Sequence, residues 1–150
     1  MIIAIDGPSA SGKSTTAKGV SNKLGFTHID TGSMYRAVTL GLSHENIMLD
    51  DRNSIISYLE NLDLKFDSSG HIVLKGENVS NAIRTVEISS KVSMISAIPE
   101  IRSKMVDFQR NIAGKSDCVL EGRDIGTVVF PNADYKFFLI ADIDIRAQRR

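Results

Sequence analysis

The residues best suited to chemistry lie near the start of the chain, in the stretch Gly7-Pro-Ser-Ala-Ser-Gly-Lys-Ser14. Its spacing, G-x-x-x-x-G-K-[ST], is typical of loops that bind nucleoside triphosphates. Glycines let the backbone approach an anion closely, and successive N–H groups can then point at it. The pattern predicts a site for ATP and Mg²⁺, in which Lys13 reaches the β- and γ-phosphates and the Ser14 hydroxyl ligates the metal. The residues expected to contact ATP are Gly7, Pro8, Ser9, Ala10, Ser11, Gly12, Lys13, Ser14 and Thr15.

The segments around this loop support that prediction over the simpler alternative, a glycine-rich turn that only joins a strand to a helix. The apolar run Ile2-Ile-Ala-Ile5 precedes the loop, and residues 13–24 follow it with apolar side chains at helical spacing. Gly25 stands where a helix C-cap is expected. A strand before the loop and a helix after it are the context that a phosphate-binding loop requires.

A second group of candidate residues follows the buried strand expected at 117–121. Glu121 ends this strand, where phosphate-loop proteins commonly carry an acid that holds Mg²⁺ through water. Arg123 and Asp124 come directly after it. Charges gathered at the end of a central strand must be paired or serve a ligand, so a ligand role is favoured over a structural ion-pair cluster.

Arg36 lies near the start of the helix that follows the short strand at 26–29. Open α/β sheets bind ligands at this edge, but the residue is equally consistent with a solvated helix arginine. His28 and His44 have no cysteine, histidine or carboxylate at ligand spacing, so both are interpreted as structural. Metal binding by protein side chains alone is therefore not expected.

The remaining pattern predicts an α/β protein with an inserted antiparallel unit. We expect helices at about 50–62, 83–99 and 101–114, with Ile55, Ile56 and Leu59 facing inward in the first of them. Two alternating segments, 64–66 and 71–75, predict a hairpin, and 76–78 predicts a second tight turn. We expect another core strand at 135–140 and a very basic helix from Arg146 to Arg150.

Composition narrows the classes of protein. The 150 residues carry a formal net charge of zero, 42% hydrophobic and 24% charged residues, which is typical of a soluble globular domain. No basic surface suggests a nucleic-acid or membrane partner, and no apolar run approaches the ~20 residues of a membrane span. A core strand begins almost at once, so no leader peptide is expected. A single cysteine, Cys118, in an apolar stretch suits a reducing compartment, so a cytoplasmic location is expected.

Together these features favour phosphoryl transfer. Several arginines with no obvious general base suit an acceptor that is itself a phosphate, such as a nucleoside monophosphate. A GTPase is disfavoured, because Asn22-Lys-Leu-Gly25 lacks the aspartate of the guanine-reading N-K-x-D pattern and lies at a helix end.

The sequence resembles the bacterial cytidylate (CMP/dCMP) kinases, a family of nucleoside monophosphate kinases. The resemblance is carried by four stretches: Asp6-Gly-Pro-Ser-Ala-Ser-Gly-Lys-Ser14, Asp30-Thr-Gly-Ser-Met-Tyr-Arg36, Ile83-Arg-Thr85 and Glu121-Gly-Arg-Asp-Ile-Gly-Thr-Val-Val-Phe-Pro-Asn-Ala133. It implies transfer of a phosphoryl group from ATP to CMP or dCMP with Mg²⁺. It also implies a three-layer P-loop kinase fold with a mostly parallel central sheet and an NMP-binding insertion at about 62–98. A monomer is expected, because moving parts must enclose the acceptor, and only small-molecule partners are expected.

The resemblance also assigns roles to residues. Arg36 and Arg123 match positions that hold the acceptor's phosphate, which a planar guanidinium can grip at two oxygens. Ser93, Arg102 and Asp124 match positions that read the base, where a carboxylate suits the 4-amino group of cytosine. The implied CMP-binding residues are Asp30, Thr31, Arg36, Ser93, Arg102, Arg123 and Asp124, and the implied catalytic residues are Lys13, Arg36 and Arg123.

Members of this family continue for several tens of residues beyond the point that matches Arg150. The C-terminal lid and the last strand are therefore expected to be absent from these 150 residues, which would make the kinase core incomplete. Two alternatives stay open beside a (d)CMP kinase: a truncated nucleotide-binding fragment without turnover, and a P-loop kinase for another small acceptor.

Overall fold

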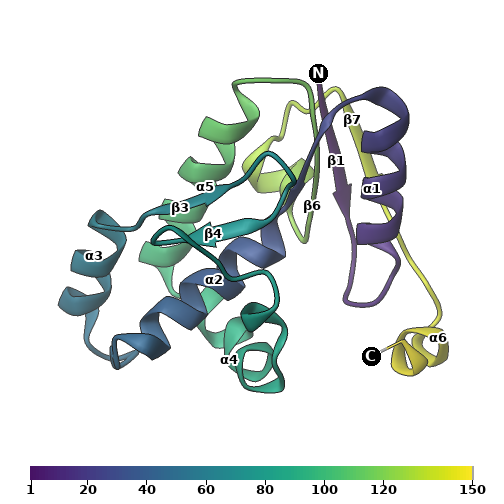
Figure 1. Cartoon of the computed structure of the whole chain (residues 1–150). Coiled ribbons are helices and arrows are strands. Elements are labelled where there is room, and N and C mark those ends of the chain that lie inside the picture. The colour runs from purple at the N-terminus through teal and green to yellow at the C-terminus, as the bar shows by residue number, and fades with distance from the viewer. Residues whose placement is uncertain (150) are drawn as a thin grey trace. The chain divides into compact units, whose positions relative to one another are not determined.

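The computed structural model describes residues 1–149 and divides into two compact units (Figure 1). One comprises residues 1–31 with the segment from 109 onward, and we call it the parallel-sheet unit. The other comprises residues 32–108, and we call it the helical unit.

The parallel-sheet unit is built on four strands in the order β2-β6-β1-β7, all of them parallel. These strands are β1 (Ile2–Asp6), β2 (Thr27–Asp30), β6 (Cys118–Gly122) and β7 (Tyr135–Phe138). Both β1 and β6 are near-continuous apolar runs, as expected of strands at the centre of a parallel sheet. The predicted α/β class with a mostly parallel central sheet is confirmed.

Helix α1 (Lys13–Leu24) packs along β1, β2 and β6 (Figure 1). Ala17 is fully buried against Ile3, Ile5 and Val119, which form one core cluster. The helix ends at Gly25, whose φ of 70° is the left-handed C-cap conformation that glycine adopts without strain. The predicted bounds and cap of this helix are confirmed.

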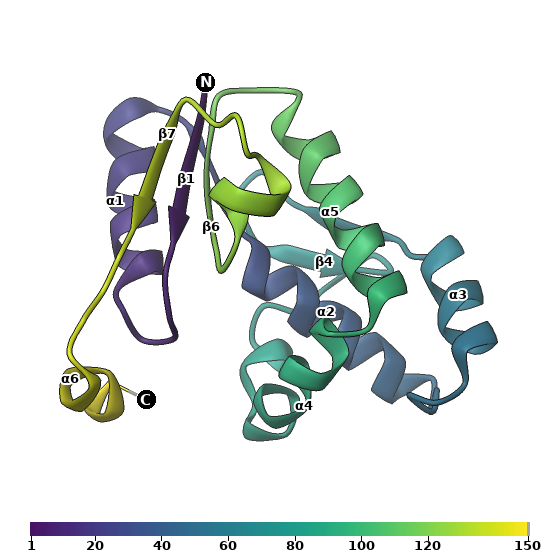
Figure 2. The same cartoon turned by 180° about the vertical axis from the view of Figure 1, so that it is seen from behind.

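The strand expected in the core at 135–140 lies instead at the edge of the sheet. β7 ends at Phe138, and among residues 1–149 it pairs with β1 alone, beside which Figure 2 shows it from behind. Its side chains are exposed, including Phe137 at 53% and Phe138 at 67%. A short, mostly apolar run such as residues 135–140 predicts a strand but does not distinguish an edge from a centre. The short helix α6 (Ile143–Gln148) follows, and Arg150 lies outside the described residues.

The helical unit contains all of α2 (Thr31–His44) but its first residue, together with α3 (Arg52–Glu60), the 3-10 turn η1 (Ala82–Arg84), α4 (Val86–Ser96) and most of α5 (Pro99–Ala113). A three-stranded antiparallel sheet of β3 (Leu64–Phe66), β4 (Ile72–Leu74) and β5 (Glu77–Asn78) completes it. The predicted hairpin is confirmed, and Phe66 pairs with Ile72 across it.

Two local predictions in this unit are wrong. Residues Glu77 and Asn78 form β5, and the turn before them lies at Lys75 and Gly76, whose φ angles are 49° and 83°. In α3 the buried residues are Ile55, Tyr58 and Leu59, whereas Ile56 is 38% exposed. Positions 55, 58 and 59 lie on one side of a helix of 3.6 residues per turn, and position 56 is rotated away from them.

Within residues 1–149, no helix is long and apolar enough to cross a membrane.

Candidate nucleotide-binding site

The loop between β1 and α1 has the backbone that its sequence predicts. Gly7 has φ 152°, and a Cβ atom there would lie 2.3 Å from the carbonyl oxygen of Leu139. Gly12, the N-cap of α1, has φ 97°. Ala10 also has a positive φ, 61°, and non-glycine residues in this conformation gather at functional sites. The loop borders a hollow of about 590 Å³ lined by residues 10–16 and Arg149.

Lys13 folds back over this loop. Its Nζ donates to the Pro8 carbonyl oxygen at 2.7 Å, which places the ammonium group across the loop. Partial burial lowers the pKa of Lys13, and the positive charge of Arg123 lowers that pKa further. Two of the three predicted catalytic residues, Lys13 and Arg123, therefore lie close enough for the charge of Arg123 to affect the pKa of Lys13.

Ser14 and Glu121, the two residues predicted to hold Mg²⁺, are hydrogen-bonded to each other. The Ser14 Oγ donates to Glu121 Oε2 at 2.7 Å, and the Glu121 side chain is only 4% exposed. Thr31 Oγ1 donates to the Glu121 carbonyl oxygen at 2.7 Å, which ties the start of α2 to the end of β6. A hydroxyl and a carboxylate are the hard oxygen donors that Mg²⁺ takes, together with phosphate oxygens and water.

These donors fit a metal that arrives with its nucleotide. Residues 1–149 contain no group of three or more His, Cys, Asp or Glu side chains that could hold a metal ion. Mg²⁺ commonly binds through one or two protein oxygens and substrate phosphates, with several waters retained. The Ser14–Glu121 pair meets that requirement.

Basic side chains of α6 and of its C-cap residue, Arg149, contact the same loop. Arg146 Nε donates to the Ser9 carbonyl oxygen at 2.9 Å, and Arg149 Nη1 donates to the Ala10 carbonyl oxygen at 3.4 Å. Two guanidinium groups thus hydrogen-bond to carbonyl oxygens of the loop backbone, and both place positive charge beside the loop.

The turn after β6 carries Arg123 and Asp124 and is held by Asp6. Asp6 Oδ1 accepts from the Ile125 N–H and Oδ2 from the Gly126 N–H, each at 2.8 Å. Asp6 is 7% exposed, so both bonds are buried. The segment Ile125–Val129 (η2) forms a π-helical turn beside β6, visible in Figure 2. Arg123 is exposed and Asp124 half-buried at the start of this turn.

Arg110 supports the same turn at its far end. Arg110 Nε donates to the Val129 carbonyl oxygen at 3.0 Å, and Nη2 donates to the Val128 carbonyl oxygen at 3.1 Å. Neither this contact nor the role of Asp6 was predicted from the sequence, because each partner lies far along the chain.

The other residues predicted to bind CMP lie in the helical unit, except Asp30 and Thr31 at the end of β2. Arg36 on α2 donates from Nη1 to Ser89 Oγ on α4 at 2.6 Å. Ser93 is exposed one turn further along α4, on the same face as Ser89. Arg102 is half-buried on α5. The assembly of these residues with Arg123 and Asp124 into one acceptor site stays a prediction.

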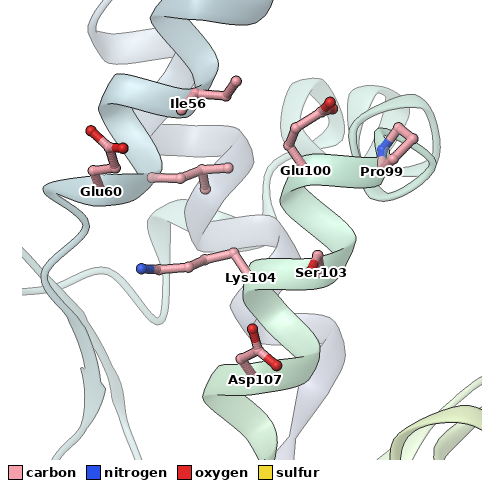
Figure 3. Close-up of a pocket in the computed structure, with 8 residues that line it drawn as sticks. Ile56, Glu60, Pro99, Glu100, Ser103, Lys104 and Asp107 are labelled. Atoms are coloured by element: carbon pink, nitrogen blue, oxygen red, sulfur yellow. The ribbon is translucent and has the colours of Figure 1, made fainter.

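The helical unit also holds a groove of about 450 Å³ between α3 and α5 (Figure 3). Ile56, Leu59 and Pro99 give it apolar walls, and the side chains of Glu60 and Lys104 lie at its border. None of the lining residues is among those predicted to bind nucleotide. The exposed position of Ile56 on this groove explains why that side chain is not in the core.

A phosphate-binding loop between a parallel β1 and α1, with a buried acid on the adjacent strand, defines a P-loop nucleotide-binding protein. The chain matches the family model described as cytidylate kinase over residues 3–150. It therefore belongs to the cytidylate kinase family, and the predicted resemblance is confirmed.

Individual relatives agree with the family assignment. The chain is 51% identical over 148 residues to a cytidylate kinase of Caldanaerobacter subterraneus subsp. tengcongensis, covering 99% of this chain and 66% of that protein. It is 50% identical over 156 residues to one of Chloroherpeton thalassium, covering 100% of this chain and 65% of that protein. The one of Lactobacillus gasseri is 47% identical over 154 residues, with coverages of 100% and 66%. The chain thus spans slightly less than two thirds of the length of these curated relatives.

One solved structure, TT1252 from Thermus thermophilus, aligns over 99% of this chain and 70% of its own length. Its TM-score of 0.45 and 14% identity are too low to bear on fold or function.

Proposed function

We propose that this protein transfers the γ-phosphoryl group of ATP to CMP or dCMP, giving CDP or dCDP. The observation that carries the proposal is the hydrogen bond from Ser14 to the buried Glu121 beside a phosphate-binding loop, in a chain of the cytidylate kinase family. In this proposal, the arrangement would bind ATP, which is the phosphoryl donor of the reaction.

In this proposal the loop N–H groups and Lys13 bind the ATP phosphates. Ser14 would ligate Mg²⁺ directly and Glu121 would hold it through water. When bound, Mg²⁺ would neutralise the negative charge that develops on the phosphates during transfer. Arg36 and Arg123 would bind the phosphate of CMP and align its oxygen with the γ-phosphorus, because catalysis of this reaction rests mainly on positioning and charge stabilisation.

Base recognition would fall to Ser93, Arg102 and Asp124. The Asp124 carboxylate can accept from the 4-amino group of cytosine, whereas uracil would present a carbonyl oxygen to it. A buried polar group left without a partner strongly reduces kcat/KM for the wrong substrate. Asp30 and Thr31, at the end of β2, would border the same nucleotide.

We propose a monomer that binds only small molecules and works in the cytoplasm. The support is a net charge of zero and one cysteine, Cys118, which is buried.

The test is a coupled assay of ADP formation from ATP with CMP, dCMP, UMP or AMP as acceptor, alongside calorimetry of ATP binding. CMP and dCMP are expected to be the best acceptors. Preference for AMP would indicate a kinase for another acceptor, and ATP binding without CDP formation would indicate a nucleotide-binding chain without turnover.

The base-reading role is tested separately with Asp124→Asn. We expect the ratio of kcat/KM for CMP over UMP to fall by at least about 10-fold, the size of one well-formed polar contact in base discrimination. Asp50→Asn, at an exposed carboxylate in a loop, is the matched control and should leave the ratio unchanged. An unchanged ratio in Asp124→Asn would remove this residue from the specificity site.

A further inference from the structure

The buried carboxylate of Glu121 is held at both of its oxygens. Oε2 accepts from Ser14 Oγ at 2.7 Å, and Oε1 lies 2.9 Å from His28 Nε2. The His28 side chain is 19% exposed and that of Glu121 is 4% exposed. His28, Glu121 and Ser14 therefore form one chain of hydrogen bonds at the edge of the phosphate-binding loop.

The sheet register explains why these residues meet. His28 on β2 lies opposite Val119 on β6, and Asp30 lies opposite Glu121. Because side chains alternate along a strand, His28, Val119 and Glu121 project to the same face of the sheet. Val119 packs with Ala17 of α1, so this is the face that α1 covers. Ser14 lies in the first turn of that helix and completes the chain.

The donors and acceptors in this chain have a definite direction. An ionised carboxylate only accepts, so Nε2 of His28 carries the proton of the His28–Glu121 bond. Ser14 has a single hydroxyl proton, which it gives to Glu121. Its two lone pairs are then left for a cation. With both oxygens engaged, the Glu121 carboxylate cannot rotate freely, and the direction of the Ser14 lone pairs is fixed with it.

We propose that His28 is a positioning residue for the Mg²⁺ of bound Mg–ATP, acting through Glu121 on Ser14. His28 would not touch the metal or the nucleotide. This inference rests on the proposed function only in assuming that the loop binds Mg–ATP. Metal ligands are commonly oriented by hydrogen bonds from residues that do not themselves touch the metal. Losing such a hydrogen bond typically lowers metal affinity about 10- to 100-fold.

The experiment measures ATP binding by calorimetry, once with saturating Mg²⁺ and once with EDTA, in wild type and in His28→Leu. The ratio of the two affinities reports the metal alone. We expect His28→Leu to lower that ratio about 10-fold, the lower end of the range because Glu121 would reach the metal through water. Affinity for ATP in EDTA should stay at the wild-type value.

Two further variants separate positioning from packing. His28→Gln keeps an N–H donor at a similar reach and should restore most of the ratio. His44→Leu removes an exposed histidine at the end of α2 and should match wild type. A wild-type ratio in His28→Leu would overturn the proposal, and so would an equal loss of ATP affinity in EDTA, which would mark a purely structural role.

The outcome is distinguishable from that of the proposed function. Wild type that binds Mg–ATP but does not phosphorylate CMP would refute the kinase assignment and leave the His28 inference standing. Phosphorylation of CMP with an unchanged metal ratio in His28→Leu would do the reverse.

Discussion

Asp6→Asn is the substitution with the most clearly defined consequence in this structure. The two carboxylate oxygens of Asp6 each accept a backbone N–H, from Ile125 and from Gly126, at 2.8 Å. Asparagine has one acceptor oxygen and an NH₂ group of almost the same shape. The change therefore preserves volume, breaks one of the two bonds and turns a donor toward a buried N–H.

The magnitude follows from that geometry. A hydrogen bond to a charged group contributes about 1.5–3 kcal/mol, and a buried donor left unsatisfied costs about 1–3 kcal/mol. These two effects overlap, so we expect the free energy of unfolding to fall by about 2–4 kcal/mol. That is a large share of the ~5–15 kcal/mol that stabilises an ordinary domain.

Urea unfolding followed by circular dichroism measures this change. The control is Asp134→Asn, because Asp134 also accepts a backbone N–H, from Ile2 at 2.6 Å, but is exposed. Exposed polar contacts contribute little, so the control should change stability by less than about 1 kcal/mol. A change within about 0.5 kcal/mol of wild type in Asp6→Asn, at an unchanged m-value, would refute the reasoning.

The same variant has an enzymatic readout. Asp6 holds the turn that carries Arg123 and Asp124, so its loss should raise the KM for CMP more than it weakens ATP binding. Equal effects on both substrates would indicate that Asp6 acts on the phosphate-binding loop instead.

Lys13→Met should lower ATP affinity in calorimetry by at least about 10-fold, since it removes a charged hydrogen-bond donor from the loop; wild-type affinity would exclude Lys13 from the site. Tyr58→Phe should raise the free energy of unfolding by about 1 kcal/mol in urea titrations, because the buried Tyr58 hydroxyl has no hydrogen-bond partner among residues 1–149. Gly41→Ala should lower the free energy of unfolding by about 1–3 kcal/mol, since a Cβ atom there would lie 1.8 Å from the Tyr58 Oη. Unchanged stability in Tyr58→Phe or in Gly41→Ala would contradict the buried position of the Tyr58 hydroxyl beside Gly41. Burial raises the pKa of the Cys118 thiol from 9.0 to about 11, so Ellman's reagent at pH 8 should label it only after unfolding. The unfolded chain releases that proton first, so stability should fall as pH rises from 9 toward 11 in wild type and less in Cys118→Ala.

The predictable part of the site is the part encoded by neighbouring residues. The phosphate-binding loop spans eight consecutive positions, from Gly7 to Ser14, and its spacing already contains the required backbone. Glu121 was predicted to hold Mg²⁺ because phosphate-loop proteins commonly carry an acid at the end of the neighbouring strand. Both predictions needed only the order of elements, without the register of any strand pair.

The unpredicted part depends on register and side-chain direction. His28 was interpreted as structural, since no partner stands at ligand spacing in the sequence, yet its carboxylate partner is 93 residues away. The Asp6 contacts span 119 and 120 residues. In α3, the amphipathic pattern placed Ile56 inward, where the structure places Tyr58. A small error in helical phase was enough to exchange them.

The end of β6 connects the Ser14–Glu121 contact to the turn that carries Arg123 and Asp124. Glu121 contacts Ser14, and two residues later Arg123 stands at the start of the turn that Asp6 holds. Gly122 lies between them, where a Cβ atom would come within 2.6 Å of the Ile125 side chain and 2.8 Å of Thr31 Oγ1. A side chain at position 122 would crowd both neighbours, and its absence lets the chain turn closely between Glu121 and Arg123. The pairing of Asp6 with Gly122 joins the end of β1, where the phosphate-binding loop begins, to the start of the Arg123 turn. The proposed transfer between two substrates would need these two segments to be held in a fixed relative position.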